Sequence, residues 1–103
     1  MFARNVSIHL KSNMLSDYTQ TFENDTLPLL RQQKGFKDEI TLSNPGSLDV
    51  FAISLWDSKA NAETYNTNTY PQVLRTFERM IDGTPKVQTF EAVTTFHNVA
   101  VAA

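Results

Sequence analysis

The segment "LDVFAISLW" (residues 48–56) most constrains the fold, because it reads as a strand that is apolar on both faces. The alternating positions carry apolar side chains alike: Phe51, Ile53 and Leu55 on one face, and Val50, Ala52 and Trp56 on the other. A strand of this kind is normally covered on both sides. The sheet that contains it therefore needs a layer on each face.

The flanking segments alternate between strand and helix patterns. Strands are expected over residues 2–10, 36–44, 48–56 and 86–102, and helices over 14–34, from Ser58 to about residue 66, and from Pro71 onward. The order β-α-β-β-α-β predicts an α+β, ferredoxin-like fold, with a four-stranded antiparallel sheet and its helices on one face. The 103 residues suit a single domain, residues 1–103. A second copy of the sheet is expected to cover the free face, which predicts a homodimer.

Several single residues predict how these segments begin and end. Asn13 is expected to cap the first helix, and Gly35 to end it in a left-handed conformation. Pro28 should kink that helix because it lacks a backbone N–H. Pro45 and Gly46 occupy the positions that a type II turn prefers.

Composition argues against several classes of function. The formal net charge is −2 and there is no basic block, which argues against nucleic acid as a partner. An RNA-recognition module shares the element order, but "LDVFAISLW" holds no lysine, arginine or glycine. There is no cysteine, no signal-peptide pattern at the N-terminus and no apolar run long enough to span a membrane. The sequence thus predicts no membrane partner and fits a cytoplasmic protein.

A polar row stands out on the first strand, where Asn5, Ser7 and His9 share one face. Buried polar groups need hydrogen-bond partners. The row either lines a small polar cavity or is satisfied by neighbouring strands, water or the dimer partner. No spacing of His9 with other ligand-type residues indicates a metal site.

Three aromatic residues follow the third strand: Trp56, Tyr65 and Tyr70. The short helix between them offers mainly alanines, so a gap between this helix and the sheet is expected. Trp56 either lines that gap or simply fills the end of the core, and Tyr65 and Tyr70 are expected at its rim. Arg75 falls opposite the apolar stripe of the last helix and is expected in solvent.

Three stretches carry a resemblance to a known family: "LPLLRQQKGF" (27–36), "LWDSKANAETY" (55–65) and "YPQVLRTFERM" (70–80). With the element order, they resemble the antibiotic biosynthesis monooxygenase family of dimeric α/β barrels, over nearly the whole chain. That superfamily includes cofactor-independent oxygenases acting on phenolic or anthrone-like substrates, heme-degrading oxygenases and members without an established activity. Heme degraders use an asparagine that Asn5 matches, but no histidine lies between Tyr65 and Met80 to bind the iron.

The resemblance implies a cofactor-independent monooxygenase, needing neither flavin nor metal, that acts on a small aromatic or quinol-like molecule. Asn5 and Trp56 would orient the substrate and stabilise its anion, and His9 is the one evident base. The remaining expected substrate contacts are Tyr65, Ser7 and Tyr70. The alternative is a non-enzymatic dimeric barrel that binds a small apolar ligand.

Overall fold

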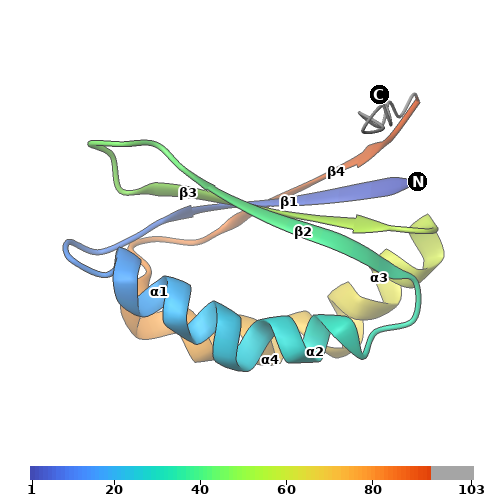
Figure 1. The fold of residues 1–103 in the computed structure, drawn as a ribbon, viewed down its shortest axis with the longest axis horizontal. Helices are drawn as coiled ribbons and strands as arrows, with labels where there is room; N and C mark the ends of the chain where they lie inside the picture. The colour runs from blue at the N-terminus through green and yellow to red at the C-terminus, as the bar shows by residue number, and fades with distance from the viewer. Residues whose placement is uncertain (94–103) are drawn as a thin grey trace, which may run out of the picture.

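The structure is a computed structural model that describes residues 1–93. Its centre is a four-stranded antiparallel sheet in the order β2-β3-β1-β4 (Figure 1). The strands are β1 (Phe2–His9), β2 (Phe36–Ser43), β3 (Asp49–Trp56) and β4 (Lys86–Glu91). The predicted ferredoxin-like α+β fold is confirmed, and β1 and β3 are the central strands.

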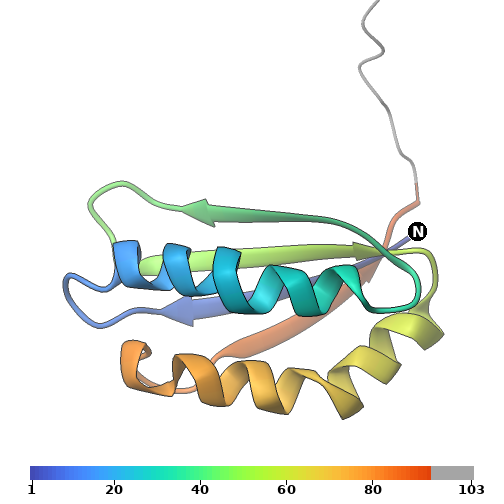
Figure 2. The same cartoon turned by 60° about the horizontal axis from the view of Figure 1, so that its bottom comes forward.

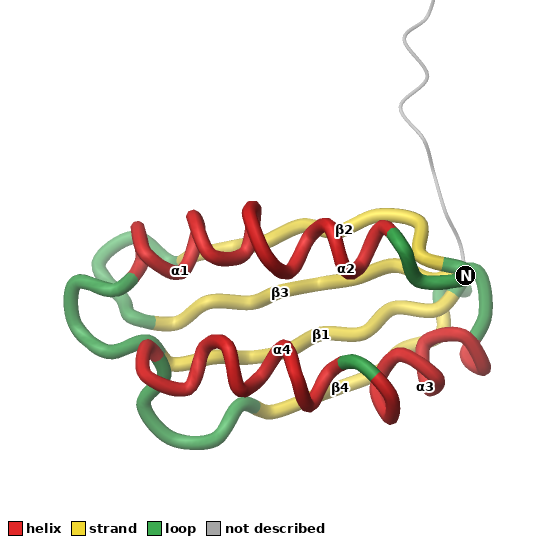
Figure 3. Tube along the Cα trace, turned by 90° about the horizontal axis from the view of Figure 1, so that it is seen from below, coloured by secondary structure: helices red, strands yellow, loops and turns green. Residues whose placement is uncertain are grey.

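Two helical rods cover one face of this sheet. The first joins α1 (Leu15–Thr21), a π-helical turn η1 (Phe22–Thr26) and α2 (Leu27–Arg31), and the second joins α3 (Lys59–Asn68), α4 (Tyr70–Phe77) and a 3₁₀ turn η2 (Glu78–Met80). Figures 2 and 3 show the rods side by side on the same face, with the α1–α2 rod over the β2 side and the α3–α4 rod over the β4 side.

Strand alternation decides which side chains enter the core. On β1 the buried positions are Phe2, Arg4, Val6 and Ile8, and the intervening residues face away from the helices. The stripe predicted for the last helix meets this face, with Val73 and Phe77 of α4 buried against it. Arg75 lies exposed on the opposite side of α4, as predicted.

The other face of the sheet lacks a covering layer within residues 1–93 (Figure 1). Four large apolar side chains there are solvent-exposed: Ile40 at 52%, Leu42 at 45%, Phe51 at 36% and Phe90 at 54%. β3 was expected to be covered on both faces, and the helices cover one of them. The second layer, a partner sheet, stays a prediction.

Two local expectations about the first helix need correction. Asn13 adopts φ 62°, a left-handed conformation that asparagine tolerates, and Met14 becomes the N-cap without a side-chain hydrogen bond. The helical rod ends at Arg31 rather than at residue 34, although Gly35 does adopt a left-handed φ of 83°. The kink expected at Pro28 stays a prediction: Pro28 is the second residue of α2, just beyond the wider turn of η1, and the helix runs on to Arg31.

The last strand is shorter in the described chain than the expected range of 86–102. The structure has β4 over Lys86–Glu91. The part of the expected strand beyond residue 93 lies outside the described residues.

We expect Gly35→Ala to destabilise the protein more than Gly46→Ala, by roughly 1–3 kcal/mol of unfolding free energy. Both glycines have a φ above 80°, so an alanine pays a similar backbone strain at either site. A methyl group at Gly35 would also overlap side-chain atoms of Asp57 and Asn61, whereas at Gly46 it meets nothing within 4 Å. Urea unfolding of the two variants checks this, and equal losses would contradict the crowding at Gly35.

Candidate functional site

A narrow pocket, with a cavity volume of about 40 Å³, lies between the helix-covered face of the sheet and the two rods. Its floor is formed by β1 and β3, with Val6, Ile8 and Ala52 among the lining residues. Aromatic rings make up much of its wall: Tyr18, Phe22, Tyr65, Tyr70 and Phe77. The surface offered to a ligand is therefore mainly flat and apolar, with a few polar groups.

Tyr65 and Tyr70, both predicted as substrate contacts, line the pocket. Tyr65 is buried on α3, where Ser58 caps the helix by accepting a hydrogen bond from the Asn61 N–H at 3.2 Å. The centroids of the two tyrosine rings lie 6.4 Å apart. Burial raises the pKa of Tyr65 to about 12 and also raises the pKa of Tyr70, so both phenols are protonated at neutral pH.

Trp56 is fully buried and lies outside the set of pocket-lining residues. Its ring packs 5.1 Å from the Tyr65 ring and edge-on to Phe36 at 5.6 Å, measured between centroids. The indole N–H donates to the Ser54 hydroxyl at 2.9 Å. Of the two interpretations of Trp56, the geometry favours the structural one: the residue supports the pocket wall from behind Tyr65.

The polar row of β1 faces away from this pocket. Asn5 and Ser7 lie on the helix-free face, where the Asn5 amide donates to the Ser7 hydroxyl at 3.3 Å. The Asn5 Oδ1 atom is buried without a hydrogen-bond partner in the described chain. In a single chain, these residues and the pocket are on opposite sides of the sheet.

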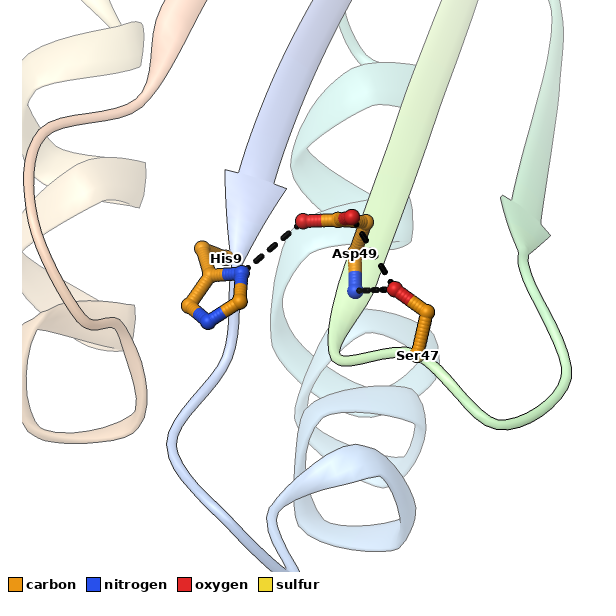
Figure 4. Close-up of polar contacts among 3 residues, drawn as sticks. All are labelled: His9, Ser47 and Asp49. Atoms are coloured by element: carbon orange, nitrogen blue, oxygen red, sulfur yellow. Dashed lines mark hydrogen bonds and ion pairs between the residues drawn. The ribbon is translucent and has the colours of Figure 1, made fainter.

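His9 lies at the end of β1, at the rim of the same helix-free face. Figure 4 shows its ring against Asp49 of β3, with Nδ1 2.8 Å from the carboxylate, and Ser47 on the far side of Asp49. The hydrogen bond with His9 lowers the pKa of Asp49. Because His9 and Asp49 are each about half exposed, this pair is a surface contact between two strands, away from the pocket.

Two charged side chains that line the pocket were missed by the sequence analysis: Arg4 and Glu39. The Arg4 side chain is 3% exposed, and its Nη2 donates to the Asn66 Oδ1 atom at 2.9 Å. Its guanidinium carbon lies 4.0 Å from the centroid of the Tyr70 ring. The sequence did contain a sign that Arg4 is buried, because Arg4 lies on the same face of the strand as the apolar Val6 and Ile8.

Glu39 lies on β2, and strand pairing puts it in one cross-strand row with Ser54 and Arg4. It is half-buried, and its carboxylate accepts a hydrogen bond from the Thr41 hydroxyl at 2.8 Å. Burial raises the pKa of the Glu39 carboxyl. A second hollow, beside α1 and η1, shares Tyr18, Phe22 and Glu39 with the pocket, which places Glu39 between the two.

The described residues contain no group of three histidine, aspartate or glutamate side chains that could hold a metal ion. Among the helices of residues 1–93, none has the length and apolarity that crossing a bilayer demands.

Comparison with known proteins finds likeness in structure alone. No protein-family model and no curated protein sequence matches the chain. A candidate antibiotic biosynthesis monooxygenase from Deinococcus radiodurans superposes with a TM-score of 0.76 at 12% identity, covering 94% of this chain and 97% of that one.

Two further solved structures are oxygenases by name. A monooxygenase from the gene ActVA-Orf6 of Streptomyces coelicolor, in complex with nanaomycin D, has a TM-score of 0.78 at 11% identity over 93% of this chain and 90% of that one. SnoaB, a cofactor-independent oxygenase from Streptomyces nogalater, has a TM-score of 0.76 at 12% identity over 91% and 94%. The chain therefore has the fold of the antibiotic biosynthesis monooxygenases, as the resemblance implied.

We expect Ser54→Ala and Trp56→Phe to be coupled in their effect on stability. Ser54→Ala leaves the buried indole N–H without its acceptor and should cost about 1–3 kcal/mol. In the double variant the unsatisfied donor is gone, so its loss should be smaller than the sum of the single losses by at least about 0.5 kcal/mol. Urea unfolding of the four proteins measures this, and strictly additive losses would mean that the hydrogen bond does not stabilise the site.

Proposed function

We propose that the protein is a cofactor-independent monooxygenase that oxidises a small aromatic, quinol-like molecule held between the sheet and the helices. The observation that carries the proposal is the aromatic-walled pocket with two charged side chains, Arg4 and Glu39, in its lining. The fold shared with a cofactor-independent oxygenase supports the choice of reaction. Flat aromatic molecules stack well on such walls.

In this reaction an acidic ring position is deprotonated, and the resulting anion passes an electron to O₂. Recombination and loss of water convert a ring CH₂ into a carbonyl, with one oxygen atom in the product and the other in water. The substrate supplies all four electrons. The protein has to accept a proton and stabilise the anion.

Glu39 is the group that we assign to the proton transfer. His9, the base expected from the sequence, lies at the rim of the opposite face. Glu39 lines the pocket, and the second hollow beside it offers a way to pass the proton to solvent. Tyr65 and Tyr70 are proposed as contacts to the substrate ring, with Trp56 holding Tyr65 in place.

Asn5, Ser7 and His9 are not assigned to the substrate pocket in this proposal. They belong to the helix-free face, together with the exposed apolar side chains of β2, β3 and β4. We assign that face to contact with a second copy of the chain, which would supply partners for polar atoms such as Asn5 Oδ1. The homodimer would complete the barrel that the resemblance implies.

We expect purified protein to consume oxygen with an anthrone, and Glu39→Gln to lower the rate by about 10²–10⁴-fold. The wild-type rate should fall as pH drops through the raised pKa of Glu39, since the protonated carboxyl cannot accept a proton. The variant should lack this acid limb. Glu63→Gln on α3 makes the same chemical change at an exposed site and should leave the rate unchanged.

Oxygen uptake is measured with an electrode, on metal-stripped protein, against the rate without enzyme. A flat trace with every substrate would exclude the monooxygenase. If the same aromatic molecules still bound specifically, the alternative would stand, namely a non-enzymatic barrel that binds a small ligand.

We expect Leu42→Lys to convert the dimer into a monomer, because it places a charge on the apolar face that would be buried between the sheets. Leu15→Lys is the matched control, since Leu15 has the same 45% exposure but lies on α1, on the helical side. Sedimentation velocity at micromolar concentration gives the mass. A wild-type monomer would rule out this use of the face.

A further inference from the structure

We propose that the pocket binds its ligand through an ionised oxygen, held by the Arg4 guanidinium, so that the natural ligand is an aromatic carboxylate or phenolate. This inference rests on the pocket of the proposed function and narrows its substrate class. It does not depend on the oxygen chemistry. Four observations support it: the burial of Arg4, its lack of a counter-charge, the tyrosines around it, and the position of the negative Glu39 at the other end of the pocket.

The Arg4 charge is buried without an acidic partner in the described chain. Its side chain is 3% exposed, and its Nε has no hydrogen-bond partner among residues 1–93. The ion pairs in this part of the chain join His9 to Asp49 and Lys59 to Glu63, and residues 94–103 contain no aspartate or glutamate. Removing a charge from water is costly unless a counter-charge replaces the solvent.

The surrounding tyrosines hold the guanidinium but do not neutralise it. Its carbon lies 4.0 Å from the Tyr70 centroid and 5.2 Å from the Tyr65 centroid, which favours a cation over the ring faces. Burial keeps the pKa of each phenol above its ordinary value, so neither supplies a negative charge at neutral pH. A negative charge has to come from outside the described chain.

The other charged group of the pocket gives the ligand an orientation. Glu39 and Arg4 are on β2 and β1, two strands apart, with Ser54 of β3 between them in the same row. Neighbouring strands are about 4.8 Å apart, so the two backbones are separated by about 10 Å. A ligand anion is therefore attracted to the Arg4 end and repelled at the Glu39 end. The planar guanidinium suits carboxylate or phenolate oxygens, because its N–H groups form a fixed fork.

The test compares 2-naphthoate with its neutral counterpart 2-naphthamide on the wild-type protein. We expect naphthoate to bind about tenfold or more tightly by calorimetry, since hydrogen bonds to charged groups are the stronger ones. In ¹⁵N-resolved NMR spectra the Arg4 Nε–H signal should shift with naphthoate and much less with naphthamide. Equal affinities, or no naphthoate binding at millimolar concentration, would overturn the proposal.

Arg4→Met removes the charge and keeps a long apolar side chain. It should abolish the preference for naphthoate while naphthamide still binds, and the fold should tolerate it because an unpaired buried charge disappears. Arg75→Met is the matched control on the exposed side of α4 and should keep the preference. A preference that survives Arg4→Met would also overturn the proposal. If that variant fails to fold, the affinities of the wild-type protein for naphthoate and naphthamide and the NMR signal of Arg4 Nε–H still test the proposal.

A third probe, 2-naphthol, separates the two sources of the anion. Absorbance of bound naphtholate at neutral pH would identify phenolates as ligands, whereas naphthol bound in its neutral form, more weakly than naphthoate, would identify carboxylates. Oxygen uptake is recorded on the same samples. A clear preference for the anion with a flat oxygen trace would reject the monooxygenase and leave the Arg4 site standing, and uptake without any preference would do the reverse.

Discussion

The contact of Trp56 with Ser54, Phe36 and Tyr65 holds the sheet and the helices in register. The indole N–H is satisfied within β3 itself, and its ring packs on the first residue of β2 and on α3. Trp56 can be fully buried because its indole N–H has a hydrogen-bond acceptor, and its buried ring fixes α3 over the end of the sheet. Tyr65 takes its position in the pocket wall from that support, and Arg4 in turn lies near the Tyr65 ring.

The fold could be predicted from the sequence because its main signals are local. Alternation along residues 2–10, the doubly apolar strand at 48–56 and the cap at Ser58 each depend on neighbouring residues, and the structure has the strands and the cap in place. The expectations that failed involve choices between near-equal local solutions. Asn13 could cap a helix or adopt a left-handed turn; it adopts the second, and the Met14 carbonyl accepts the first helical hydrogen bond, from the Tyr18 N–H.

The site was harder to predict, because alternation shows which residues share a face but not which face meets the helices. Arg4 and Asn5 are adjacent and point to opposite sides of β1. The polar row that contains Asn5 was predicted as a site, whereas Arg4 was not, because it alternates with apolar residues and is buried together with them. Glu39 joins the site only through the pairing of β2 with β3, a long-range register that the sequence does not reveal. Tyr65 was identified because its helix offered little else to fill the space.

The placement of the pocket on the helical side has a consequence for an assembled protein. The helix-free face and the pocket are both built on β1 and β3, but from alternate residues whose side chains point to opposite sides of the sheet. A substitution on one surface therefore leaves the side chains of the other unchanged. Two joined copies would present two identical sites, one in each helical layer, with both sheets between them. Each copy would then fill its own site independently, and saturation would follow a simple hyperbola with two equivalents of ligand per pair.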